Sequence, residues 1–493
     1  MVTNTFFKKI HVILFGFVFL LSCSGKADLG LDLTTSVPPT ALVASEVQSV
    51  VQASATAVDN SAQAIAVVDR RGVPLAVFSK TSATADTLET ALSLARTGAF
   101  FSNDQAPLSS RTVSFISREH FPPGIDNTAS GALFGIEHTN RGCSFNTVFA
   151  AGKSVTPATA VDGVSSGKGI TVSPGGVPLF RSGRLVGGLG VAGGSDAENE
   201  FAAFQGLSLF APTPADPGII FIDGVALPFV EQTTQPAGTA AGSLTGTFVV
   251  ASKDGGVPSE GELVTPKDSP TADSPKLLAS DVTTIINNAI ATANKTRGLI
   301  RLPIGQRAKM SIAVTDLSGN ILGLHRMTDS TIFSLDVSVA KARNVTYFSG
   351  ASVATEDQIS GIPLGTAITN RTIGFGSQPF FPSGINGTDP GPFRDIFTFD
   401  ATHPCTQGRQ AANANQNGIV FFPGSSPLYK DNGSGTKVLV GGLGVSGDGV
   451  EQDDYVTAGG LVGYEPPESI RADQILVRNV RLPFFKFPRN PED

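Results

Sequence analysis

Two stretches of the sequence carry the spacing G-x-G-x-x-G, at residues 188–193 and 442–447. In dinucleotide-binding proteins this spacing follows the first strand of a βαβ unit and opens a helix whose N-terminus receives a pyrophosphate. Here each copy closes a block of similar order, and carboxylates such as Asp196 and Asp448 follow it. Because those carboxylates would repel a phosphate, we predict a strand whose glycines let another backbone or a flat ligand approach closely.

The acidic run at residues 448–454 could also be interpreted as a calcium loop. It lacks the alternating ligands and the twelfth-position Glu of an EF-hand, so we predict instead that these acids cap a helix. The sequence shows no G-x-S-x-G elbow, Ser/His/Asp set or paired carboxylates of a hydrolase, and we expect no catalysis.

The histidines form no H-x-x-x-H or H-E-x-x-H motif, but a single His can be an axial haem ligand, as can Met, Tyr or Cys. His325, Arg326 and Met327 combine a potential iron ligand, a cation suited to a carboxylate, and a polarisable thioether. The competing interpretation is that they are ordinary strand-end side chains that face solvent.

Length and composition limit the number of domains and the class of partner. A chain of 493 residues with 41% hydrophobic content exceeds one core, which indicates two to three domains. The net charge of −7, the absence of Trp and the lack of basic runs beyond the first dozen residues argue against a nucleic-acid partner.

The N-terminus has the composition of an export signal. Lys8 and Lys9 precede an apolar run from Ile10 to Leu21, which is too short to favour a spanning helix. The end of this run, Leu-Leu-Ser-Cys, resembles a bacterial lipoprotein signal, in which Cys23 becomes the lipidated first residue. We therefore expect a signal peptide at 1–22, a tether at 23–40, and a lipoprotein anchored in the cell envelope that faces the periplasm or the cell surface. The alternative is an ordinary signal peptide with an incidental Cys.

The rest of the chain repeats one plan, in a block at 41–230 and a block at 276–485, with a linker at 231–275 and a tail at 486–493. Within the linker, the apolar stretch at 247–250 could pair with another strand. Apolar periodicity predicts the same elements in the same order in both blocks. These are a helix (42–58; 277–293), a hairpin (64–78; 311–325), a second helix (84–101; one through 338–343 that ends near 347–349) and closing strands (176–194; 426–447).

A long Phe-, Pro- and Gly-rich section follows the second helix of each block and contains residues 121–128 or 381–388. Long irregular connections of this kind tend to be functional or interfacial. Cys143 and Cys405 lie downstream of these motifs, one in each block, and an even pair in an exported protein is a disulfide candidate. We predict a Cys143–Cys405 disulfide between the blocks.

The order of these motifs resembles the GlcG/HbpS-like haem-binding domain family over most of both blocks. The resemblance rests on Ile-Ala-Val-Val-Asp at 65–69, Ala-Lys-Ala-Arg at 340–343, Gly-Gly-Val-Pro-Leu at 175–179 and Val-Gly-Gly-Leu-Gly-Val-Ser-Gly at 440–447. It implies an α+β chain of two tandem profilin-like α/β/α domains, each an antiparallel sheet of about five strands flanked by helices. It also implies assembly into homo-oligomers through sheet or helix faces.

The resemblance further implies binding of haem or a related tetrapyrrole, with a cobalamin-type ligand or no ligand as alternatives. The family's Arg-Met-Asp-Gly-Ala-like strand end matches residues 326–330, whereas residues 79–83 of the first block lack the Arg and Met. We expect a pocket between the blocks, lined by the Phe-rich sections. His325 or His120 would be the ligand, with Met327 nearby, and Arg326 or Lys80 would face a propionate.

Two other functions remain open at this point. One is a structural or interaction module, a fused pseudo-dimer of the envelope whose cofactor site has decayed. The other is an enzyme that acts on haem, for which the sequence offers no catalytic constellation.

Overall fold

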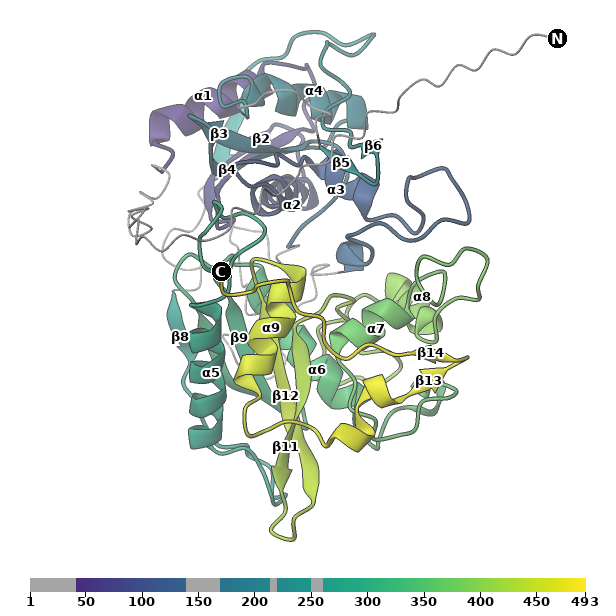
Figure 1. The fold of residues 1–493 in the computed structure, drawn as a ribbon. Helices are drawn as coiled ribbons and strands as arrows, with labels where there is room; N and C mark the ends of the chain where they lie inside the picture. The colour runs from purple at the N-terminus through teal and green to yellow at the C-terminus, as the bar shows by residue number, and fades with distance from the viewer. Residues whose placement is uncertain (1–40, 139–168, 213–219, 250–259) are drawn as a thin grey trace, which may run out of the picture. The chain divides into compact units, whose positions relative to one another are not determined.

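The predicted order of helix, hairpin, helix and closing strands is present in both blocks of the computed structural model (Figure 1). The structure describes residues 41–138, 169–212, 220–249 and 260–493. We call residues 41–249 module 1 and residues 260–493 module 2. Residues Pro39–Asp493 form one unit by their contacts.

Module 1 is an antiparallel sheet between two helical layers. The strand order is β3-β4-β1-β2-β7. Apolar side chains alternate between the two faces of β1, so the residues at 65 and 67 pack under α1 and α4, while those at 64, 66 and 68 pack under α2. The bounds are α1 (Ala44–Ala55), β1 (Ala64–Asp69), β2 (Pro74–Lys80), α2 (Ala85–Phe101), β3 (Gly176–Arg181), β4 (Arg184–Ala192), α4 (Asp196–Leu207) and β7 (Gly246–Val249).

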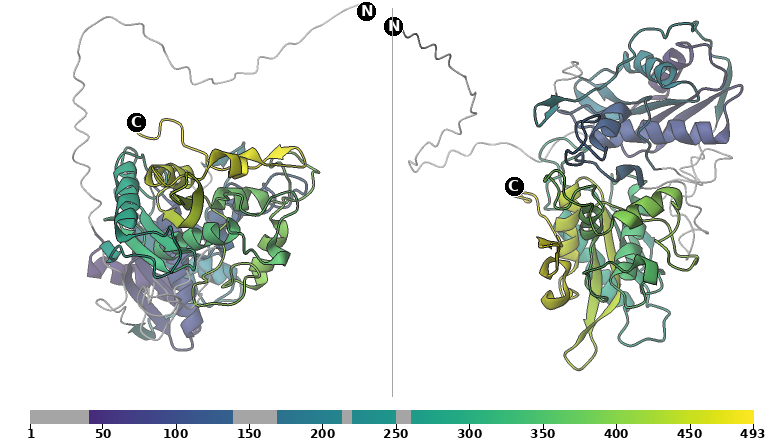
Figure 2. Two further views of the ribbon diagram at one scale, coloured as in Figure 1. Left: turned by 90° about the horizontal axis from the view of Figure 1, so that it is seen from below. Right: turned by 90° about the vertical axis from the view of Figure 1, so that its right-hand side faces the viewer.

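Module 2 repeats this arrangement with the order β11-β12-β9-β10-β8. Helices α5 and α9 share a core with one face of the sheet, and α6 packs on the other face (Figures 1 and 2). The bounds are β8 (Gly261–Val264), α5 (Ala279–Ala293), β9 (Ser311–Asp316), β10 (Ile321–Arg326), α6 (Ser334–Phe348), β11 (Ser425–Asp431), β12 (Lys437–Ser446) and α9 (Val450–Gly460). The predicted fold, two tandem α/β/α domains with five-stranded antiparallel sheets, is confirmed.

The segment at 231–275, predicted to be a linker, differs from that expectation. It supplies an edge strand to each sheet, because β7 pairs with β2 and β8 pairs with β10. These strands are short, and their partners would otherwise leave unpaired backbone groups at the sheet edge. The pairing of β7 agrees with the expectation for residues 247–250, whereas β8 was not predicted, because an edge strand needs few buried side chains.

The glycine-rich stretches lie in β4 and β12, where the helix backbone packs directly on the sheet. A Cβ at Gly188 or Gly190 would lie 2.0 Å from a carbonyl oxygen of α2, and one at Gly444 would lie 1.9 Å from the Ser338 carbonyl of α6. Only glycine leaves room for this approach. The prediction that these glycines admit another backbone is confirmed.

The Phe-rich sections form short helices and irregular chain beside the sheets, and their side chains join clusters that contain residues of both modules. One such cluster includes Phe100 and Phe101 of module 1 with Phe333 and Phe422 of module 2. The remaining elements are α3 (Ser110–Ile116), η1 (Ile136–His138), β5 (Phe221–Ile222), β6 (Val225–Ala226), η2 (Thr355–Asp357), α7 (Asn370–Gly376), α8 (Arg394–Thr402), η3 (Glu468–Ile470), η4 (Ala472–Gln474), β13 (Leu476–Val477) and β14 (Val480–Arg481).

Several predictions fall outside the described residues. The signal peptide, the tether with Cys23, and Cys143 all lie there, so the lipid anchor and the Cys143–Cys405 disulfide stay predictions. Within residues 41–138, 169–212, 220–249 and 260–493, no helix is long and apolar enough to cross a bilayer.

Candidate functional site

His325 lies on β10, where its residue pairs with Ile312 of β9 and with Glu262 of β8. The side chain is half-buried, and burial lowers the pKa of the imidazole, although the nearby Glu262 carboxylate acts in the opposite direction. His325 is therefore a neutral imidazole near neutral pH, which is the form that binds a metal.

The two neighbours of His325 have structural contacts. The buried Arg326 guanidinium donates to the Ser330 carbonyl from both Nε (3.1 Å) and Nη2 (2.6 Å). Burial lowers the pKa of Arg326 to about 10. Met327 lies in the core of module 2 with Met310. Arg326 thus closes the turn at the strand end, and Met327 fills the core beneath it.

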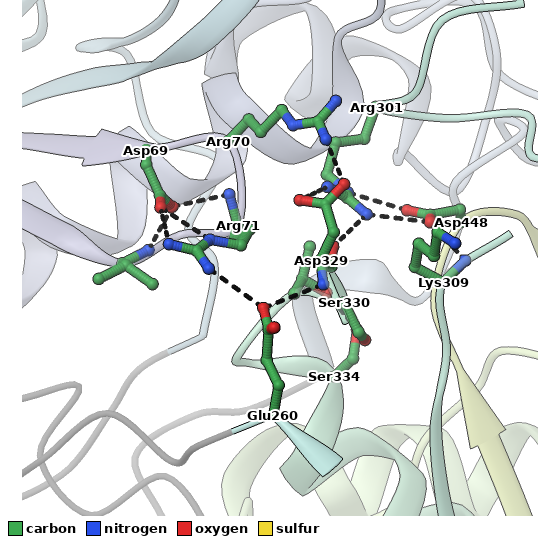
Figure 3. Close-up of polar contacts among 12 residues, drawn as sticks. Asp69, Arg70, Arg71, Glu260, Arg301, Lys309, Asp329, Ser330, Ser334 and Asp448 are labelled. Carbon is green, nitrogen blue, oxygen red and sulfur yellow. Dashed lines mark hydrogen bonds and ion pairs between the residues drawn. The ribbon is translucent and has the colours of Figure 1, made fainter. Parts of the chain in front are cut away.

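The strand end at 326–330 is covered by the β1–β2 turn of module 1 (Figure 3). Arg70 forms an ion pair with Asp329, and the Arg71 carbonyl accepts from the Ile332 amide at 3.1 Å. Arg71 also bonds Glu260 at 3.1 Å, and Glu260 in turn accepts from the Asp329 amide at 3.0 Å. These contacts join module 1 to the segment that the family resemblance assigned to the cofactor.

The same network continues to a fully buried pair, Arg301 and Asp448 (Figure 3). Arg301 donates from Nε (2.9 Å) and Nη2 (3.0 Å) to the two carboxylate oxygens, and the Lys309 amide donates to Oδ2 at 2.8 Å. Burial raises the pKa of Asp448, and Arg301 opposes that effect. Geometry of this kind is bidentate, which suits a clamp between loops.

The prediction that the acids at 448–454 cap a helix is wrong for module 2. Gly449 is the N-cap of α9, and no side chain caps it. Asp448, Asp453 and Asp454 are instead buried in ion pairs with cations from three other segments. At the matching place in module 1, Ser195 and Glu198 form a capping box at the start of α4.

Lys80 and His120 lie apart from β10. Lys80 is only 4% exposed on β2, and its Nζ donates to the Val58 carbonyl at 2.7 Å. Burial lowers the pKa of Lys80, and Asp59 opposes this. His120 follows α3, with Nδ1 2.7 Å from the Thr128 carbonyl and its ring 5.5 Å from that of Phe380. The five predicted cofactor residues thus occupy three different parts of the fold.

The Phe-rich sections do border a cleft, of about 280 Å³. We call it the aromatic cleft. Its walls include Phe134 of module 1 and three aromatic residues of module 2, and two cations, Arg371 and Lys486, lie at its margin; the module 2 aromatics are Phe375, Phe421 and Phe422. No histidine lines it among the residues that the structure describes.

Only part of the Arg371 guanidinium is paired with a buried carboxylate. Its Nε pairs with Asp454, whose pKa is raised by burial and lowered again by this pair. The Arg371 Nη2 atom is buried, yet it has no hydrogen-bond partner among the described residues. A buried donor without an acceptor is unfavourable, so the cleft presents a position that an anionic oxygen would fill.

His138 contacts a residue of the cleft wall, Phe421. The sequence alone did not indicate it as a site residue. The His138 ring centroid lies 3.9 Å from that of Phe397 and 5.2 Å from that of Phe421, which lines the cleft. Its Nδ1 is 2.7 Å from Asp400 Oδ2, on α8. A carboxylate bonded to one ring nitrogen orients the other toward a metal. His138 and Asp400 are 262 positions apart, so no local motif could reveal the pair.

A second cavity, of about 60 Å³, shares Phe422 and Val450 with the aromatic cleft. Phe100, Phe101 and Phe333 line it, and so do the buried Lys341 and Asp453. We call it the aromatic chamber. Across the described part of the chain, no group of three or more His, Cys, Asp or Glu side chains is arranged to hold a metal ion.

Three solved structures resemble about one module each. A PduOC–heme complex is 19% identical with a TM-score of 0.23 and covers 38% of this chain and 96% of its own. The Klebsiella pneumoniae protein ORFY, of the DUF336 family, is 18% identical with a TM-score of 0.25 and covers 41% and 98%. HbpS is 16% identical with a TM-score of 0.23 and covers 40% and 97%.

No curated protein matches the chain. One family model, described as haem degrading protein HbpS-like, matches residues 40–208 and 277–461. The two matched regions make up most of the chain and fall one in each module. The chain therefore belongs to the HbpS-like family, as a tandem duplication of its domain.

Proposed function

We propose that the protein binds haem or a related tetrapyrrole in the aromatic cleft. The observation that carries this proposal is the buried, unpartnered Nη2 of Arg371 among phenylalanine rings, in a chain of the HbpS-like family. Phenylalanine faces suit a flat apolar macrocycle, and a guanidinium suits a propionate.

The size of the aromatic cleft determines how such a ligand would sit. Its volume of about 280 Å³ is near the lower limit of small-molecule sites, which span ~300–1,000 Å³. The cleft would therefore hold one edge of a tetrapyrrole. Lys486, whose side chain is 67% exposed and forms an ion pair with Glu451, would exchange that partner for a second carboxylate at the rim.

Bound haem would supply an iron that a protein side chain could coordinate. His138 is our first candidate for that ligand, because Asp400 orients its ring beside the cleft wall. His120 and His325, which the sequence favoured, are the other candidates. The physiological role would be sensing, storage or scavenging by an exported lipoprotein, with the lipid on Cys23. The mass of the mature N-terminal peptide tests the anchor.

Titration of the purified protein with haemin tests the binding. We expect a saturable Soret shift that His138→Ala weakens more than His120→Ala or His325→Ala does. Lys486→Ala should weaken binding by roughly three- to tenfold, on the order of 1 kcal/mol. Lys437→Ala is the matched control, because Lys437 lies at the far end of β12 and lines neither cavity.

The titration also separates the other hypotheses. A flat titration would contradict the proposal and favour the structural pseudo-dimer, whose modules already share the apolar cluster around Phe100 and Phe333. Time-dependent loss of the Soret band would point to haem breakdown, the activity that the family description names.

A further inference from the structure

The aromatic chamber contains a buried ion pair with an unsatisfied acceptor. Lys341 of α6 donates from Nζ to Asp453 Oδ2 of α9 at 2.8 Å and to the Val445 carbonyl of β12 at 2.7 Å. The other carboxylate oxygen, Asp453 Oδ1, is buried and has no hydrogen-bond partner in the described ranges. Asp453 is 6% exposed and lines the chamber.

The equivalent position of module 1 has no lysine–aspartate pair. Next to Gly424 of module 2 lie Asp453 and Lys341, and next to the corresponding Gly175 of module 1 lie Asn199 and Leu94. The correspondence is fixed by the backbone, because the carbonyls of Gly424 and Gly175 each accept from a valine of the equivalent strand, Val445 of β12 at 2.7 Å and Val191 of β4 at 2.9 Å.

The neutral version in module 1 satisfies its own polar atoms. Asn199 accepts from the Gly194 amide at 2.9 Å and donates to the Gly194 carbonyl at 3.0 Å. A buried ion pair with an unmet acceptor is a less stable solution for the same site. Module 2 therefore keeps an unfavourable charged pair, Lys341 and Asp453, where module 1 has the uncharged Leu94 and Asn199. The charged pair of module 2 lines the aromatic chamber.

We infer that the aromatic chamber is a ligand site for a small neutral molecule that has an apolar body and one hydroxyl or amino group. The donor of the ligand would bond Asp453 Oδ1, and its apolar part would lie against Phe100, Phe333 and Phe422. This site is separate from the tetrapyrrole proposal, because it needs neither the iron nor the cations of the aromatic cleft.

The volume and the charges of the chamber limit the ligand. The chamber volume of about 60 Å³ limits the ligand to a molecule of a few non-hydrogen atoms. Anions are disfavoured, because Asp448 and Asp454 add negative charge near Asp453, while Lys341 is already paired. Burial raises the pKa of Asp453 to about 7, so the carboxylate is a full acceptor above that pH.

Methyl NMR of the haem-free full chain can test this inference with two probes. Ethanol and acetonitrile have the same number of non-hydrogen atoms, but only ethanol carries a donor. At pH 8 we expect ethanol to cause saturable shifts of the methyl groups of Ile300, Val337 and Val450, which line the chamber. Acetonitrile should bind there about tenfold more weakly.

The double variant Lys341→Leu/Asp453→Asn supplies the decisive comparison, because it copies the residues that module 1 uses at the same place. It should remove the preference for ethanol, so that both probes bind equally. The control is Lys430→Leu/Asp281→Asn, which removes a lysine–aspartate pair outside the chamber, with an Nζ–Oδ2 distance of 2.6 Å. It should leave the preference intact.

Two results would overturn the inference. One is equal binding of both probes to the unmodified chain at these methyl groups. The other is an unchanged ethanol preference in the double variant. Folding of the double variant is confirmed independently by the methyl groups of module 2 that do not line the chamber, such as those of Val282 and Ile285 in the core under α5.

Discussion

At the residue scale, the candidate sites depend on three carboxylates in the seven-residue stretch 448–454, where α9 begins. Asp448, Asp453 and Asp454 are all buried, and burial raises the pKa of each. The cations that oppose this effect come from distant positions, at Arg301, Lys341 and Arg371.

Asp453 gives this arrangement a measurable pH dependence. Its pKa rises from 3.8 to about 7 on folding, so the folded chain binds a proton more tightly than the unfolded chain. The associated stability is full below pH 3.8 and is lost as pH rises through 7, by up to about 4 kcal/mol. In urea unfolding at several pH values, Lys341→Leu/Asp453→Asn should flatten the decline between pH 4 and 7.

The control for this prediction is Asp281, whose pKa is shifted in the opposite direction from that of Asp453. Burial disfavours the charged form of Asp281, but the bonds from Lys430, the Leu278 amide and Tyr464 outweigh it, and the net pKa is lowered. The stability from Asp281 is therefore present above its ordinary pKa and lost below it. Lys430→Leu/Asp281→Asn should weaken the chain mainly above pH 4, and an identical pH profile for both variants would contradict the assignment.

At the element scale, the fold depends on direct contact between helix and strand backbones. The glycines of β4 and β12 allow α2 and α6 to pack without intervening side chains. This close packing positions Lys341 on α6 so that its Nζ reaches the Val445 carbonyl of β12. A glycine pattern that suggests a phosphate loop thus has a packing function, and it indirectly shapes the chamber.

Gly444→Ala tests that contact. The added Cβ would lie 1.9 Å from the Ser338 carbonyl, so α6 must shift, and we expect a loss of about 1–3 kcal/mol in urea unfolding. Gly350→Ala, just past the end of the same helix, is the control, because its Cβ would come no closer than 3.2 Å to the nearest carbonyl oxygen, that of Tyr347. Equal stability of the two variants would refute the packing role.

At the scale of the whole molecule, the two modules share apolar and ionic contacts. The rings of Phe100 and Phe333 meet edge to face with centroids 4.6 Å apart, and both belong to one cluster. Arg70 of module 1 pairs with Asp329 of module 2 (Figure 3). The tandem duplication therefore builds one unit, and the described unit contains a cleft and a chamber with walls from both modules.

We expect the modules to unfold together in one calorimetric transition. Phe100→Ala removes a side chain that is 6% exposed and should cost about 3–5 kcal/mol, which weakens the coupling and splits the transition in two. Phe221→Ala, at a position that is 60% exposed, should leave a single transition. Two transitions in the unmodified chain would contradict a shared core.

Much of the fold follows from local pattern. Apolar periodicity located the first two helices, the hairpin and the closing strands of each block to within a few residues, since a helix or strand repeats its buried side at a fixed interval. The edge strand β8 was not predicted from the pattern, because it buries few side chains and its position is set by its partner β10.

The sequence by itself determined the duplicated plan, the layers of each module and the packing role of the glycine-rich strands. Tertiary structure alone decided the chemistry of the sites. It joined His138 to Asp400 across 262 positions and Lys341 to Asp453 across 112, and it turned an acidic run from a helix cap into buried ion pairs. Apolar periodicity is a local property that can be read along the sequence, whereas the partner of a buried charge depends on which elements pack together.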